Sequence, residues 1–278
     1  MKYFNTLPFY FFAVCLMGTH LQASASTDPD WEVFVKSYGR YTEKKLKIKK
    51  IPGGALSIVN SQARDYIHTM GHTKVRSGQK INPHTRFRLA SVSKTFAGSL
   101  AAKLANEQRL NLYLPVSHYL PDFKQTGYKD DLKVFHILSH SSGLVPNAYD
   151  NLIESRMGYN DIVEKLLSVK PICDPGDCYG YQNVMFSLID DVILKSTNKT
   201  YTQWLNDAFF TPLEMNDASL GYDAMVQDNN YAHPHVRGKK RWYSARLKKN
   251  YYKVAPAAGV NASASDMAIW LNAQLGQY

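Results

Sequence analysis

A short polar motif, Ser91-Val92-Ser93-Lys94, leads directly into an apolar helical stripe, and this pairing limits how the chain can fold. The stripe repeats every four residues, as one face of a buried helix does: Phe96, Leu100 and Leu104. We expect the helix to open at Ser91, so that Lys94 follows one turn later on the same face, within reach of the serine hydroxyl. The motif would then lie beside free backbone N–H groups that can stabilise an oxyanion.

A second motif, Tyr181-Gln182-Asn183, lies far downstream and supplies what a weak serine nucleophile lacks, a base. Free Lys and Tyr side chains have pKa values near roughly 10.4 and 10, so neither is a base at neutral pH. Burial disfavours charged lysine and a neighbouring cation favours tyrosinate, so the two together can lower both pKa values. The pair of motifs predicts a serine acyl-transfer site. The alternative is a helix-capping Ser91, a solvated Lys94 and a core Tyr181.

Further segments accompany these motifs in a fixed order: Ile137 to Leu144, Tyr179 to Ile189, Pro212 to Met215 and Ala257 to Ala268. In them we find L-S-H-S-S-G-L, Y-x-N, P-L-x-M and A-A-G-V-N followed by S-D-M-A. Together with the serine motif they resemble the serine β-lactamases and penicillin-binding proteins, and most closely the class C β-lactamase branch. The resemblance runs from about Pro52 to the last residue.

The resemblance implies a role for each motif residue. Ser91 would be the acylated nucleophile, Lys94 would share its proton, and Tyr181 would act as general base and then as acid toward the leaving group. Asn183 would hydrogen-bond the amide beside the scissile carbonyl. The implied substrates are β-lactams or D-Ala-D-Ala-type peptides, handled by a monomer with neither metal nor cofactor. Which group is the base is disputed for relatives with this motif.

Two other functions stay open: an esterase on the same scaffold, and an inactive remnant or one that binds penicillin without turnover. Gln182 stands where class C β-lactamases more usually carry a small residue, which leaves lactamase, peptidase and esterase all in contention. The chain has no G-x-S-x-G, and this excludes an ordinary α/β-hydrolase.

The family's third motif, K-T-G or H-x-G, is missing from the expected place downstream of Gly259. Lys195-Ser196-Thr197 is not followed by glycine, and His140-Ser141-Ser142-Gly143 lies ahead of Tyr181. We therefore expect a C-terminally truncated member of the family. The expected fold is α+β and β-lactamase/transpeptidase-like, a helical lobe beside an antiparallel sheet whose late strands are absent.

The first 25 residues have the pattern of a secretory signal peptide, with an apolar stretch and Ala23-Ser24-Ala25 as the cleavage site. We therefore expect export to the periplasm or medium and one hydrolase domain over residues 26–278. Cys173 and Cys178 flank Asp-Pro-Gly-Asp, a turn sequence that brings the two close, so an oxidising compartment predicts a disulfide. Two free thiols are the alternative.

The formal charge of +10 is concentrated between Arg237 and Lys253, where eight basic residues occur and no acidic one. Tyrosines and Trp242 interleave with these charges, the composition of a nucleic-acid groove. Because export argues against nucleic acid, we expect an anionic envelope polymer or membrane surface as partner; a solvated basic loop is the alternative. His136 and His140 have zinc-helix spacing, but no Glu follows the first, so we expect no metal.

The remaining pattern predicts the order of elements. An amphipathic helix covers 31–38, and a hairpin pairs 54–59 with 65–69. The stretch from 91 to about 210 is helical, with helix caps at Asn160 and Thr200, and a last helix spans 266–275.

Overall fold

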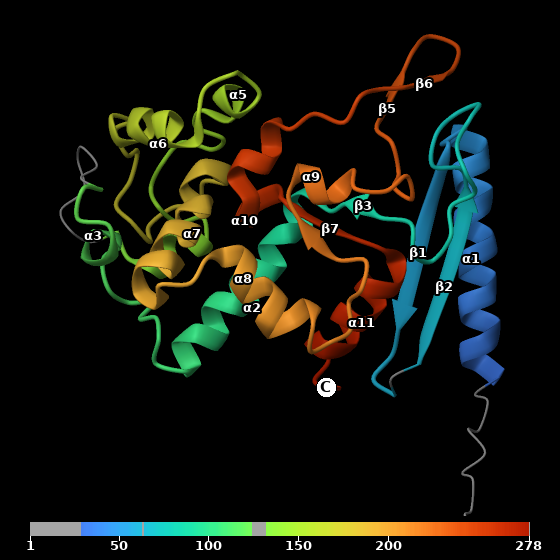
Figure 1. Ribbon diagram of the computed structural model, residues 1–278, viewed down its shortest axis with the longest axis horizontal. Helices are drawn as coiled ribbons and strands as arrows, with labels where there is room; N and C mark the ends of the chain where they lie inside the picture. The colour runs from blue at the N-terminus through green and yellow to red at the C-terminus, as the bar shows by residue number, and fades with distance from the viewer. Residues whose placement is uncertain (1–28, 63, 124–131, 278) are drawn as a thin grey trace, which may run out of the picture.

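The computed structural model describes residues 29–62, 64–123 and 132–277, so the predicted signal peptide lies outside the described residues. A helical lobe lies on one side of the molecule, and short antiparallel strands with a long N-terminal helix lie on the other (Figure 1). The predicted α+β class is therefore confirmed. Among the described residues, none of the helices combines the length and the apolar character needed to span a bilayer.

Eleven α-helices and three further helical turns occur in the part of the chain that the structure describes. The α-helices are α1 (Pro29–Lys49), α2 (Ser93–Asn106), α3 (Val116–Tyr119), α4 (Val134–Leu138), α5 (Asp150–Ile153), α6 (Tyr159–Leu167), α7 (Asn183–Thr197), α8 (Tyr201–Leu205), α9 (Tyr222–Met225), α10 (Ala255–Ala258) and α11 (Ala264–Gln274). The turns are η1 (Ala90–Val92), η2 (Asn206–Phe210) and η3 (Asn250–Val254).

The predicted hairpin is present as β1 (Gly53–Val59) and β2 (Asp65–Gly71), paired antiparallel from Gly53–Gly71 to Val59–Asp65. A two-stranded ribbon is marginal by itself, and here β1 packs against both α1 and α11. Ser57 donates a hydrogen bond to the Ala264 carbonyl at 2.7 Å, which ties β1 to α11. Gly39 lets α1 approach β2, because a Cβ there would lie 2.6 Å from the Tyr66 hydroxyl.

A second small sheet links the two halves of the molecule. Its strand order is β3 (Phe87–Arg88), β7 (Val260–Ala262) and β4 (Ser219–Leu220), with both pairings antiparallel. All three residues of β7 are buried. The strand before the serine motif is thereby held against the segment that carries Gly259, and a third pair, β5 (His235–Arg237) and β6 (Trp242–Ser244), forms a separate hairpin.

The core lies in the helical lobe, around α7 and α2. The apolar stripe predicted on α2 is confirmed, since Phe96, Leu100 and Leu104 are fully buried. Phe96 stacks on Trp270 of α11 with ring centroids 4.0 Å apart, so the last helix closes the core over α2. Helix α7 is buried on most of its surface, as expected for a helix that is apolar nearly all round.

Two sequence-based boundaries were wrong. The α-helix starts at Ser93, not Ser91, and Ser91 lies in the preceding 3₁₀ turn. The predicted cap at Asn160 is also wrong, because α6 begins at Tyr159 and Gly158 precedes it. The Thr200 cap is confirmed, as its hydroxyl accepts a hydrogen bond from the Gln203 N–H.

Candidate active site

Ser91 lies in a tight turn that hydrogen bonds to β7 hold in place. Ala90 has a left-handed φ of 48°, which a non-glycine residue adopts only where the surroundings enforce it. The Leu89 N–H donates to the Val260 carbonyl at 2.9 Å, and the Val260 N–H donates to the buried Ser93 hydroxyl at 3.0 Å. The turn is thus held on both sides by β7, and Ser91 itself is exposed.

Tyr181 reaches Ser91 from a segment far away in the sequence. Its hydroxyl is hydrogen-bonded to Ser91 Oγ at 2.8 Å, across a separation of 90 residues. Tyr181 lies two residues before the start of α7, so the rigid helix fixes where the loop delivers the ring. The two predicted motifs therefore meet, with the tyrosine as the direct partner of the serine.

Lys94 lies behind this pair, half-buried. Its ammonium donates to Asn183 Oδ1 at 2.8 Å and to the Ala257 carbonyl at 3.1 Å. It lies 4.7 Å from the centroid of the Tyr181 ring. Burial lowers the pKa of Lys94, and a hydrogen bond with Tyr181 partly opposes this shift. The amine is therefore easier to deprotonate than a free lysine, as a proton-sharing role requires.

Asp150, which the sequence reasoning missed, completes a polar chain. Asn183 Nδ2 donates to Asp150 Oδ2 at 2.7 Å, so both ends of the Asn183 amide have partners. Burial raises the pKa of Asp150, while Asn183 and Lys94 oppose the shift. No spacing rule points to Asp150, because it opens a four-residue helix after a left-handed Tyr149.

His140 supports the ring of Tyr181. The two rings lie 4.4 Å apart, and the Gln182 N–H donates to His140 Nδ1 at 3.2 Å. Burial, with a smaller effect from Lys94, lowers the pKa of His140 to about 4, so the imidazole is neutral near pH 7. Among the described residues, no group of three or more His, Cys, Asp or Glu side chains could hold a metal ion.

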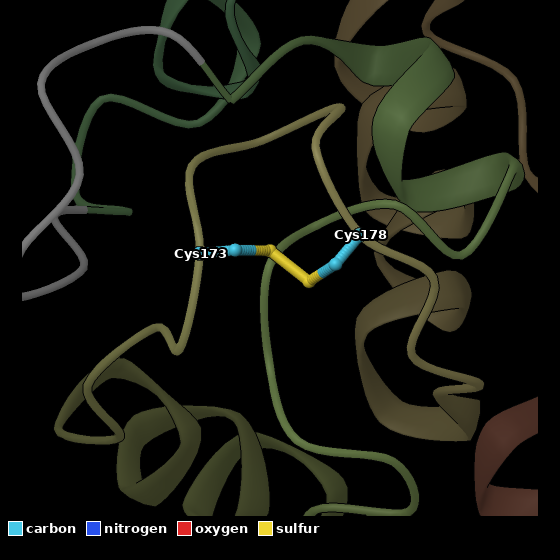
Figure 2. The surroundings of a disulfide bond; sticks show 2 residues. All are labelled: Cys173 and Cys178. Carbon is cyan, nitrogen blue, oxygen red and sulfur yellow. A yellow bond between two sulfur atoms is a disulfide. The ribbon is translucent and has the colours of Figure 1, made fainter.

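The predicted disulfide between Cys173 and Cys178 is confirmed, with Cα atoms 6.3 Å apart (Figure 2). The loop that it closes lies against residues 140–143. Gly176 N–H donates to the Ser141 carbonyl and Gly180 N–H to the His140 carbonyl, each at 2.8 Å. The disulfide thus fixes the segment that runs directly into Tyr181.

Replacing both Cys173 and Cys178 with serine should lower the melting temperature by about 4–8 °C, since closing so short a loop contributes roughly 2 kcal/mol. Scanning calorimetry measures the shift. The oxidised protein treated with a reductant should show the same shift as the double variant. An unchanged melting temperature in both would contradict the stabilising role of the disulfide.

A cavity of about 700 Å³ adjoins the serine turn, within the range of small-molecule sites. Arg88 and Ala90 line it on the side of the turn, and Tyr251 lies beside them. The guanidinium of Arg88 lies 5.4 Å from the centre of the Tyr251 ring.

A family model and several curated proteins match this chain. A family model described as Beta-lactamase matches residues 39–277. Protein flp of Staphylococcus aureus (strain MRSA252) is 26% identical over 84% of this chain and 47% of its own length. A Beta-lactamase of Escherichia coli (strain K12) is 25% identical over 83% of this chain and 58% of its own length. The chain therefore spans about half the length of these curated relatives.

Solved structures share the fold. A class C beta-lactamase in complex with cefoxitin superimposes with a TM-score of 0.74 at 25% identity, covering 89% of this chain and 67% of that one. The octameric penicillin-binding protein homologue from Pyrococcus abyssi gives a TM-score of 0.75 at 21% identity, covering 85% and 55%. The expected β-lactamase/transpeptidase-like fold is confirmed.

Proposed function

Because the chain belongs to the beta-lactamase family, we propose that it is part of a serine acyl-transfer hydrolase that acts on β-lactams or D-Ala-D-Ala-type peptides through an acyl-enzyme on Ser91. The observation that carries this proposal is the 2.8 Å hydrogen bond between Tyr181 and Ser91, with the half-buried Lys94 behind it. A serine with a tyrosine on its hydroxyl and a lysine of lowered pKa nearby has the parts of an activated nucleophile.

In the proposed reaction Tyr181 accepts the proton of Ser91 as Oγ bonds to the carbonyl carbon. The carbonyl C–N bond then breaks, and the leaving nitrogen takes the proton from Tyr181. Lys94 takes part in the proton equilibrium, because burial lowers the pKa of its amine. Water completes the cycle by hydrolysing the Ser91 ester.

Fluorescent penicillin tests the proposal, because it reports acylation and release separately. We expect a covalent label on the exported protein, and its release rate separates a β-lactamase from a slow-releasing peptidase. A D-Ala-D-Ala peptide and a simple ester are assayed beside it. An ester hydrolysed without any penicillin label would favour the esterase alternative, and no reaction with any of the three would favour an inactive remnant.

Asp150 has a positioning role in this proposal, and its charge raises the pKa of Lys94. Asp150→Asn keeps an oxygen for Asn183 but removes the charge, so Lys94 should lose its proton at lower pH. The rising limb of the acylation rate against pH should therefore move to lower pH. Glu154→Gln, an exposed neighbour, should leave the limb in place. A rising limb that keeps its position or moves to higher pH in Asp150→Asn would contradict this role of Asp150.

Export is part of the same proposal. The Cys173–Cys178 disulfide is a bond typical of oxidising compartments, and it supports a location outside the cytosol. Fractionation of the producing cells, with the protein detected by antibody, tests this. Recovery only in the cytosolic fraction would refute it.

A further inference from the structure

The basic segment 237–253 spans most of the β5–β6 hairpin, the loop that follows it and part of η3. The hairpin turn, residues 238–241, reads Gly-Lys-Lys-Arg and is closed by a hydrogen bond from the Gly238 N–H to the Arg241 carbonyl at 2.9 Å. Figure 1 shows this hairpin at the top of the view, with its turn pointing away from the rest of the chain. Its charges are therefore presented outward.

The cations of this segment divide into two groups. Lys253 is structural, because its ammonium donates to three backbone carbonyls of the 153–157 segment, and Lys249 pairs with Asp223. Six others are exposed and take part in none of the ion pairs found among residues 29–62, 64–123 and 132–277: Arg237, Lys239, Lys240, Arg241, Arg246 and Lys248. A run of exposed cations without an acidic residue creates a strong local positive potential.

The two faces of the hairpin carry different side chains, and this difference distinguishes between the possible classes of binding partner. Arg237 and Trp242 form one cross-strand pair, and Val236 and Tyr243 form the next, on the opposite face. Trp242 lines the cavity beside the serine turn. Val236 also touches that cavity yet is 57% exposed, and Tyr243 is 45% exposed. An apolar and an aromatic side chain are thus offered to solvent among the cations.

We propose that the β5–β6 hairpin binds the surface of an anionic lipid bilayer. Lysines and arginines near such a surface each strengthen binding by about fivefold, through attraction to anionic headgroups. Tyrosine favours the bilayer–water boundary, where its ring is buried and its hydroxyl stays wet. Tyr243 and Val236 would enter this boundary, while a soluble polyanion would use the cations alone. The exposed apolar pair therefore favours a membrane over a free polymer or nucleic acid.

Co-sedimentation of the full protein with phosphatidylcholine vesicles, with and without phosphatidylglycerol, tests the proposal. Binding should require phosphatidylglycerol and weaken as salt rises. The triple variant Lys239→Ala, Lys240→Ala, Arg241→Ala should bind at least about tenfold more weakly. The double variant Val236→Ser, Tyr243→Ser should also bind more weakly at unchanged charge. Unchanged binding of the double variant would overturn the lipid assignment.

A control variant that loses the same charge elsewhere distinguishes binding by the hairpin from an effect of the protein's net charge. Lys44, Lys45 and Lys49 are exposed on α1, and their replacement by alanine should reduce binding less than the hairpin triple variant does. An equal loss in the two triple variants would overturn the proposal, as would tighter binding of duplex DNA than of vesicles at the same salt. Circular dichroism melting confirms that each variant is folded.

Discussion

Replacing Ser91 with alanine will abolish the covalent penicillin adduct and reduce turnover by at least about 10⁴-fold. The hydroxyl of Ser91 is the group that Tyr181 contacts, on a turn held by β7, so its removal takes away the proposed nucleophile. Intact-protein mass spectrometry after penicillin treatment measures the adduct, and peptide mapping assigns it to the Ser91 peptide.

Two serines from another segment of the chain provide matched controls. Ser139 and Ser141 are hydrogen-bonded to each other at 2.7 Å, in the segment beneath the disulfide loop. Alanine at either position should leave the adduct in place. An adduct that maps to Ser139, Ser141 or any serine other than Ser91 would refute the assignment of the nucleophile.

Replacing Lys94 with methionine will slow acylation by about 10²–10⁴-fold, the usual contribution of a positioned acid–base group. Methionine fills the half-buried space but leaves Asn183 Oδ1 and the Ala257 carbonyl without their donor. It also removes the cation beside Tyr181. Stopped-flow measurement of acylation with a chromogenic cephalosporin gives the rate.

A second substitution asks whether Lys94 must lose its proton. Arginine stays charged at every accessible pH, so it keeps a cation beside Tyr181 but cannot share a proton with it, and Lys94→Arg should acylate more slowly than the wild type. Lys103→Met is the control, since this lysine lies on the same helix, pairs with Glu107 and is 42% exposed. A Lys94→Arg protein that is acylated at the normal rate would show that a positive charge at this position is sufficient for acylation.

Features formed by residues that lie close together in the sequence were predicted well, because local spacing determines them. The stripe on α2 follows from a period of four, and the β1–β2 hairpin from two strand-like runs around a polar turn. The disulfide follows from two cysteines at the ends of a turn sequence. Each depends on groups only a few residues apart, so the unfolded segment already limits its own geometry.

Boundaries in the helical lobe were predicted less well. The stretch from 91 to 210 is broken into short helices, which are marginal alone and exist because they pack on α7 and α2. Asn160 is a good capping residue, yet the helix begins at Tyr159, two positions before the start that a cap at Asn160 would give, and Asp161 accepts a hydrogen bond from the Gly158 N–H. Tertiary contacts decide such ends.

The sequence alone determined the family and which residue types could form the site, because Ser91, Lys94, Tyr181 and Asn183 lie in recognisable motifs. Only the tertiary structure decided how they are connected. Tyr181 is hydrogen-bonded to Ser91, while Lys94 donates to Asn183 and Asn183 in turn donates to Asp150. These contacts join segments separated by 33 to 90 residues. No local periodicity encodes such distances, because they are set by how α2, α7 and β7 pack around one core.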